Sequence, residues 1–287
     1  MVLEYIMNPF RAEKYPRRMF FIGFLYCSVA ILLSLWIFQQ QASLVMVFLT
    51  VLAATPLFYN TIKFEEKKDI SNLEEKQLLK EHWKALSYFV YLFFGVTLAT
   101  TVWYIFLPSN LITPVFSVQT QTIIDINSNV VSGATANAIS YLGAFSRIFF
   151  NNLKVLIFCI LFAFIFGMGA LFILTWNATV IGVAIGNFIR SNLAKIELGL
   201  GWNAVGSYFQ IISIGLFKYA IHGIPEILSY FVAGLAGGII SVAVIRHDFG
   251  TRMFEKILLD CSDLLIMSVI LLFIAALLEV FITPMIF

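Results

Sequence analysis

The chain has 287 residues, of which 61% are hydrophobic and 12% charged, and its formal net charge is +2. Soluble domains have about 45–50% apolar and about 25% charged residues, so this composition excludes an ordinary soluble domain and predicts a polytopic membrane protein. The small net charge does not favour nucleic-acid binding. Cys27, Cys159 and Cys261 lie in or beside apolar segments without the spacing of a zinc site or disulfide framework, which indicates small buried residues.

The first part of the chain contains three apolar runs close to the roughly 20 residues that a helix needs to cross a bilayer. They are Met19–Phe38, Ser43–Tyr59 and Ala85–Leu107, and the first two predict a hairpin. The segment Lys63–Lys84 follows this hairpin, and its Lys and Glu residues three and four apart are typical of a solvated helix. We interpret it as a water-facing connector, with a docking surface for a soluble partner as the alternative. Two parts are predicted, residues 1–84 with the hairpin and connector, and residues 85–287 as the remaining transmembrane domain.

A polar segment, Pro108–Phe150, comes next. It is rich in Ser, Thr, Asn and Gln, has no Lys and contains one Arg. Its short apolar runs are compatible with interfacial helix or with strand, and the sequence leaves both open.

The apolar run Leu153–Asn187 would give a helix about 50 Å long, which exceeds the thickness of the hydrocarbon core of a bilayer. The polar residues Trp176 and Asn177 are the predicted break. This leaves one span before the break and a short interfacial or half helix at Ala178–Phe188.

The run Trp202–Ile245 is long enough for two crossings if the chain reverses within it. Gly223 and Pro225 are the predicted reversal, because Pro lacks a backbone donor and disfavours helix in the residue before it. The fold class is therefore an all-α transmembrane bundle with about seven crossings and one short helix. The crossings after the polar segment are Leu153–Leu174, Val205–Ala220, Ile227–Ile245 and Leu264–Ile282.

Most of the 18 basic residues fall into segments on one side of this topology. Because Lys and Arg accumulate in cytoplasmic loops, we expect a multi-pass protein of the cell membrane with its N-terminus cytoplasmic and its C-terminus outside. Arg190 and Lys195 are placed on the cytoplasmic side.

Four polar residues are the main candidates for an intramembrane site. Lys218, His222 and Glu226 share one helix face at four-residue spacing, and Glu279 is expected at a similar depth. Charged groups inside a bilayer cost from about 3 to over 10 kcal/mol, so they usually mark a function or a paired arrangement. A clamp that closes the bundle, a proton or ion relay, and contact with interfacial water all remain open.

The two predicted interruptions together resemble the discontinuous helices that form transporter sites. Small residues predict close helix packing, within the chain or in a homo-oligomer; they are Gly182, Gly186, Gly234, Gly237 and Gly238. Metal-binding His pairs, nucleophile elbows and phosphate-binding loops are not found in the sequence. We therefore expect a non-enzymatic protein without a metal or cofactor.

Several motifs resemble the stage II sporulation protein M family. They are Asn151-Asn152-Leu153-Lys154-Val155, then Trp176-Asn177-Ala178 with Gly182, then His222-Gly223-Ile224-Pro225-Glu226 followed by Gly234-Leu235-Ala236-Gly237. The resemblance covers roughly Phe145 to the C-terminus, and the N-terminal hairpin and connector look like those of the longer, archaeal-type members. Where members often have Asn-Gly, this chain has Asn177-Ala178.

The resemblance implies an all-helical membrane domain without established enzymatic activity. In spore-forming bacteria the namesake works with peptidoglycan-degrading partners as their membrane anchor. The leading hypothesis is accordingly a non-enzymatic scaffold in the lipid bilayer that recruits unknown protein partners. The alternative is a transporter or channel component with a site at the broken helices.

Overall fold

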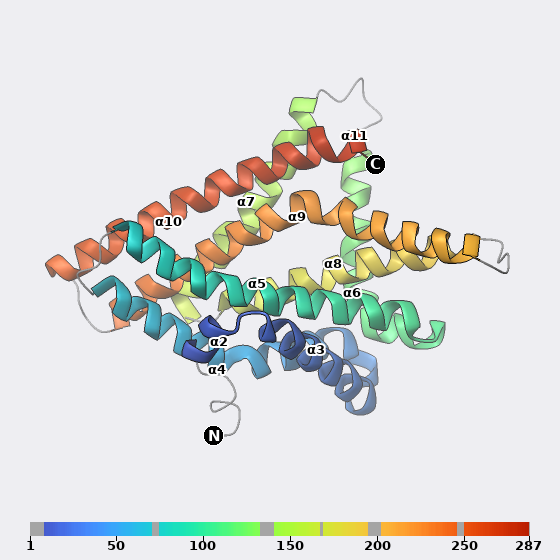
Figure 1. The fold of residues 1–287 in the computed structure, drawn as a ribbon, viewed down its shortest axis with the longest axis horizontal. Coiled ribbons are helices and arrows are strands. Elements are labelled where there is room, and N and C mark those ends of the chain that lie inside the picture. Colours follow the sequence, from blue (N-terminus) through green and yellow to red (C-terminus); the bar gives the residue numbers. More distant parts are fainter. Residues whose placement is uncertain are drawn as a thin grey trace.

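The computed structural model describes residues 9–70, 75–132, 141–166, 169–194, 202–245 and 250–286. Within these ranges the chain is helical and contains no strand. Seven of the described helices are long and apolar enough to cross a membrane. The prediction of an all-α, multi-pass bundle is confirmed (Figure 1).

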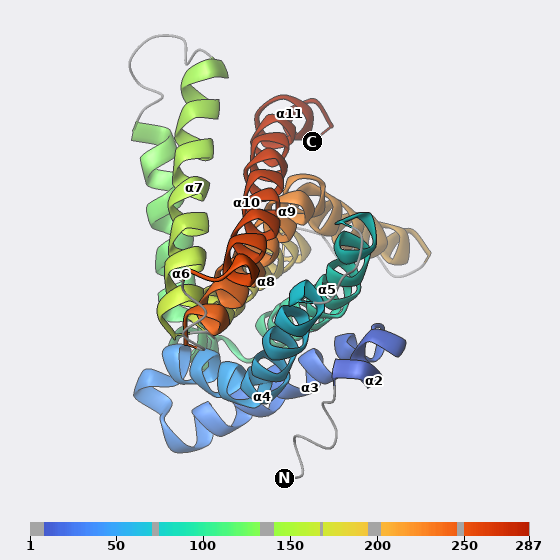
Figure 2. The same cartoon turned by 90° about the vertical axis from the view of Figure 1, so that its left-hand side faces the viewer.

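The N-terminal helices form a layer against helix α5. Helix α2 (Pro9–Lys14) precedes α3 (Arg18–Ile37), and the short turn η1 (Gln39–Gln41) joins α3 to α4 (Ala42–Ile70). Helix α3 packs along α5 (Glu75–Phe106). The two backbones approach closely because each helix places a glycine at the contact: a Cβ on Gly23 would lie 2.2 Å from the Leu92 carbonyl oxygen. Helices α2, α3 and α4 lie together at the bottom of Figure 2.

The described residues of the polar segment after α5 are helical. Its first helix is α6 (Ser109–Ser132), and α7 begins at Tyr141 and ends at Phe166. Gln119 of α6 is buried and accepts a hydrogen bond from the Ser43 hydroxyl at 2.6 Å, while its amide nitrogen lies 3.5 Å from the Thr179 hydroxyl. One polar side chain of this segment thus connects α4, α6 and α8 inside the bundle.

Helix α8 runs from Gly169 to Leu193 without interruption, so the predicted break at Trp176 and Asn177 is wrong. The Asn177 side chain donates to the carbonyl of Ile173, four residues earlier, at 2.8 Å. Because this bond lies within the helix, the polar residue is accommodated without disturbing the backbone. The predicted half helix at Ala178–Phe188 is therefore the second half of a full candidate span, Ala170–Leu193.

Helix α9 runs from Trp202 to Ile245, so the predicted reversal at Gly223 and Pro225 is also wrong. Figure 1 shows this helix bending near its middle, as expected for an internal proline that lacks a donor. Its two halves differ: residues 229–239 are all buried, whereas Phe209 and Phe217 of the first half are exposed. Seven candidate crossings are found in the described ranges, as predicted. The prediction placed two of them in the α9 segment, whereas in the structure α9 supplies one and α8 supplies the other.

The chain ends with α10 (Arg252–Leu277), the π-helical turn η2 (Leu278–Ile282) and α11 (Thr283–Ile286). Thr251 caps α10, since its hydroxyl accepts a hydrogen bond from the Phe254 amide at 3.1 Å. Helix α10 packs along α9 and also contacts α7. Its outer face carries many exposed apolar side chains, as expected for contact with lipid.

Arg190, near the end of α8, fixes the end of α5. Its guanidinium donates to the carbonyl oxygens of Tyr104 and Leu107, at 3.1 and 2.8 Å, and to the Ser109 hydroxyl at 2.9 Å. A cation at a helix C-terminus satisfies free carbonyls and complements the helix dipole. Because α5 begins at the charged connector and ends beside Arg190, these two regions lie at opposite ends of a candidate span. The prediction that Arg190 shares the side of the connector is wrong.

Candidate functional site

A cavity of about 510 Å³ lies between α6, α7, α8 and α9. Ligand pockets have about 300–1,000 Å³, so this cavity is large enough for a small molecule. Polar side chains from all four helices line it; they include Thr122 from α6, Asn151 and Asn152 from α7, Asn177 from α8, and Glu226 from α9. A polar cavity inside an apolar bundle is the strongest candidate for a functional site in the described part of the chain.

Glu226 is the acidic residue of the cavity wall. The buried hydroxyl of Tyr230, one turn further along α9, donates to its carboxylate at 2.9 Å. Glu279, in the π-helical turn after α10, is not among the residues that line the cavity. None of the described residues that line the cavity is Lys or Arg. The region therefore favours positive charge.

His222 links the cavity to the C-terminal helix. Its Nδ1 atom lies 3.3 Å from the Thr283 hydroxyl, and that hydroxyl donates to the Leu278 carbonyl at 3.1 Å. Leu278 begins the π-helical turn that carries Glu279. Single π-helical turns are frequent at functional sites, and the Thr283 hydroxyl connects His222 to the start of this one.

Lys218 is placed away from the carboxylates. Its ammonium group lies 5.6 Å from the centre of the Phe188 ring, a distance typical of a cation–π contact, and Lys218 does not line the cavity. The structure thus places His222 and Glu226 in one cavity wall and leaves Lys218 with α8. Glu279 lies in the turn that follows α10, four residues before the Thr283 contact of His222.

Trp176 and Asn177 line the same cavity as His222, Gly223 and Glu226. The sequence presented these residues as two separate interruptions of two helices. In the structure both helices are continuous, and these residues line one cavity, so the two predicted sites form a single candidate site.

Each of the five predicted packing glycines lies at a helix contact. A Cβ at Gly182 or Gly186 would lie within 3 Å of α5, at Thr100 and Tyr104 respectively. The other three lie on the buried half of α9, against Ala170 of α8, the Ile160 carbonyl of α7 and Ile62 of α4; they are Gly234, Gly237 and Gly238. Small side chains let these helices approach one another.

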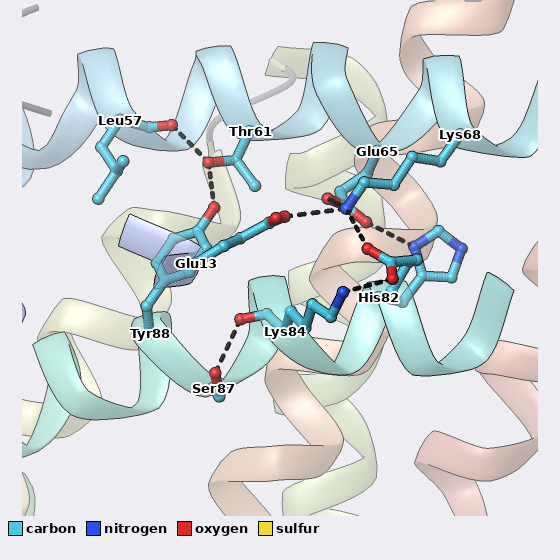
Figure 3. A network of polar contacts seen from close by, with 10 residues as sticks. Glu13, Leu57, Thr61, Glu65, Lys68, His82, Lys84, Ser87 and Tyr88 are labelled. Atoms are coloured by element: carbon cyan, nitrogen blue, oxygen red, sulfur yellow. Dashed lines mark hydrogen bonds and ion pairs between the residues drawn. The ribbon is translucent and has the colours of Figure 1, made fainter. Parts of the chain in front are cut away.

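A second polar group, which the sequence analysis missed, lies where α2, α4 and α5 meet (Figure 3). Glu65 has no exposed surface, and its carboxylate accepts from Lys68 at 2.9 Å and contacts His82 Nδ1 at 2.8 Å. Lys68 also contacts Glu13 of α2 at 2.9 Å. One turn before Glu65, Thr61 is hydrogen-bonded to Tyr88. The predicted water-facing connector is thus partly an internal ionic network.

Burial raises the pKa of the Glu13 carboxyl above its usual value, although the hydrogen bond from Lys68 acts in the opposite direction. For Lys68, burial acts to lower the pKa, but the carboxylates of Glu13 and Glu65 outweigh it and raise the pKa of the ammonium. The network therefore holds Lys68 firmly in its charged form. No group of three His, Cys, Asp or Glu residues that could hold a metal ion is found among the described residues.

The helices and the cavity define a multi-pass α-helical membrane protein with an internal polar site. Residues 19–284 match the family model described as Stage II sporulation protein M, and the chain belongs to this family. The match begins in α3, so it covers more of the chain than the predicted stretch from Phe145. No curated protein and no solved structure matches the chain.

Proposed function

We propose that this protein binds a small cationic solute in the cavity between α6, α7, α8 and α9, and acts as a transporter or as a component of one. The carrying observation is the carboxylate of Glu226 in the wall of a cavity whose described lining contains no Lys or Arg. A carboxylate in a medium of low dielectric constant attracts a cation more strongly than it does in water.

Aromatic side chains in the cavity wall support a cationic ligand. The rings belong to Phe158, Phe162, Phe172, Trp176, Tyr219 and Tyr230. Aromatic faces attract ammonium groups by about 0.5–2 kcal/mol, with the larger values where the cation is desolvated. A carboxylate bordered by such rings is suited to an organic ammonium ion.

The test uses the purified protein in phosphatidylcholine nanodiscs, with radiolabelled ethylamine as the probe. The wild type is expected to bind ethylamine saturably, and Glu226→Gln to weaken binding at least about tenfold, because a charge-assisted contact contributes about 1.5–3 kcal/mol. Glu255→Gln, at the exposed beginning of α10, is the matched control. Equal binding by wild type and Glu226→Gln would refute the proposal, and uptake into proteoliposomes separates transport from binding alone.

The scaffold hypothesis is retained as a second proposal because exposed residues remain at the beginning of α5. Lys80, Trp83 and Lys84 are exposed there, beside the ionic network. We expect the double substitution Lys80→Glu/Lys84→Glu to abolish capture of a protein partner in pull-downs while the fold is kept. Lys154→Glu on α7, also exposed, should leave capture unchanged.

For orientation, we propose that the side of the connector is cytoplasmic. Lys63, Lys67 and Lys68 of α4 and Lys80 and Lys84 of α5 gather at this end of the bundle, as expected for a cytoplasmic face. With seven crossings the two ends of the chain lie on opposite sides. Labelling of Lys84→Cys by a membrane-impermeant thiol reagent in intact cells would contradict this orientation.

A further inference from the structure

An apolar groove of about 350 Å³ lies on the other side of the cavity wall, between α3, α5, α8 and α9. Phe20, Phe94, Leu98 and Leu216 are among the side chains that line it. Thr97 is also in the lining, but its hydroxyl donates to the Phe93 carbonyl of its own helix at 3.0 Å. The groove therefore presents almost only hydrocarbon and aromatic surface.

The groove and the polar cavity share three lining residues, namely Ile181 of α8 and Tyr219 and Gly223 of α9. The two spaces thus adjoin along one short wall. A Cβ added at Gly223 would meet no atom within 4 Å, so there is free space beside the backbone at this residue. Pro225, which lacks a backbone donor, lies two residues further along α9.

We propose that the cavity and the groove form one continuous site for a single-chain amphiphile with an ammonium head and a hydrocarbon tail. The head lies beside Glu226, among the polar and aromatic residues of the cavity, and the tail passes Gly223 into the groove. This inference rests on the proposed function, because it assigns the substrate class of the same site. Charge complementarity selects the head, and the lining residues that the cavity and the apolar groove share place the groove where a tail would lie.

The physical role of the tail differs from its role in a water-soluble protein. A hydrocarbon chain that leaves lipid for an apolar groove gains no hydrophobic free energy, since lipid tails are as apolar as the groove. The tail instead concentrates the molecule in the bilayer and holds the head near Glu226, which raises its effective concentration there. The site thus selects among ammonium compounds by whether their hydrocarbon tail fits past Gly223.

The test compares dodecylamine with ethylamine, both radiolabelled, on the protein in phosphatidylcholine nanodiscs. Gly223→Leu fills the free space beside Gly223 without meeting a neighbouring atom at its Cβ, and we expect it to weaken dodecylamine binding at least tenfold more than it weakens ethylamine binding; an equal loss of both amines would contradict the tail path. Gly206→Leu is the control on the same helix, because a Cβ there also meets nothing within 4 Å; it should change neither ligand.

The outcomes separate the two proposals. If Glu226→Gln weakens both amines but Gly223→Leu leaves dodecylamine binding intact, the tail path is wrong and the cation site stands. If neither amine binds, or Glu226→Gln has no effect, the proposed function itself fails. Should Gly223→Leu not fold, as judged by size-exclusion chromatography, Ile181→Phe blocks the same wall from α8 and carries the same expectation.

Discussion

The carboxylate of Glu65 should contribute more to stability than any exposed ion pair of this chain. Its side chain has no exposed surface, and it contacts His82 Nδ1 at 2.8 Å and Lys68 at 2.9 Å. Removing one partner of a buried ion pair costs about 3–5 kcal/mol, because the other charge is left uncompensated. Lys68 keeps Glu13 at 2.9 Å, so we expect Glu65→Leu to lower the free energy of unfolding by about 3 kcal/mol, the lower end of that range.

The measurement is reversible unfolding in mixed detergent micelles, followed by circular dichroism. Lys84→Met is the control; its ion pair with Glu81 is largely exposed, with 45% exposure at the lysine, and such pairs contribute about 0–1 kcal/mol. The double variant Glu65→Leu/His82→Leu should recover part of the loss, since buried donor and acceptor are removed together. A loss below about 1 kcal/mol for Glu65→Leu would refute the reasoning.

Three further outcomes are expected in the same assay. Arg190→Met should lower the free energy of unfolding by about 1.5–3 kcal/mol, because the carbonyls at the end of α5 lose a charged donor. The control Arg147→Met, on the exposed face of α7, should lower it by less than about 0.5 kcal/mol. Equal losses for the two variants would contradict the role of Arg190 as a cap of α5. Gln119→Leu should cost about 1–3 kcal/mol, since the buried Ser43 hydroxyl loses its acceptor, and an unchanged midpoint would exclude this. The folded-state pKa of Lys68 is raised above the usual 10.5. The stabilisation that charged Lys68 provides is therefore fully present below pH 10.5 and is lost as the pH rises through the raised value. Lys68→Met should lack this loss of stability at alkaline pH, and the same dependence of stability on pH in wild type and variant would contradict the prediction.

The transmembrane character and the family follow from the sequence, because composition and apolar run length reflect the bilayer directly. The assignment of the crossings does not follow, and α8 and α9 show the reason. Asn177 was expected to break a helix, but it bonds to the Ile173 carbonyl within the helix. Pro225 was expected to reverse the chain, yet transmembrane helices tolerate proline where neighbouring helices support the bend.

The ionic network was missed for a related reason. The sequence analysis interpreted all the charged residues of the connector together as water-facing. Whether a single one of them, such as Glu65, is buried depends on which face of the helix it occupies. Leu57, Thr61 and Glu65 follow at four-residue spacing and are all buried, so Glu65 continues the inner face of α4 beyond the apolar run. That spacing was visible in the sequence; the facing His82 on α5 was not, since its position depends on how the two helices pair.

The continuity of α9 has a mechanical consequence. At about 1.5 Å per residue its 44 residues extend over roughly 66 Å, which exceeds the thickness of the hydrocarbon. One continuous helix thus joins the exposed first half, the cavity wall at Glu226 and the buried second half. Because the two ends of α9 lie far from Pro225, a small change of the helix angle at this residue would displace the ends much more than the residues near the bend.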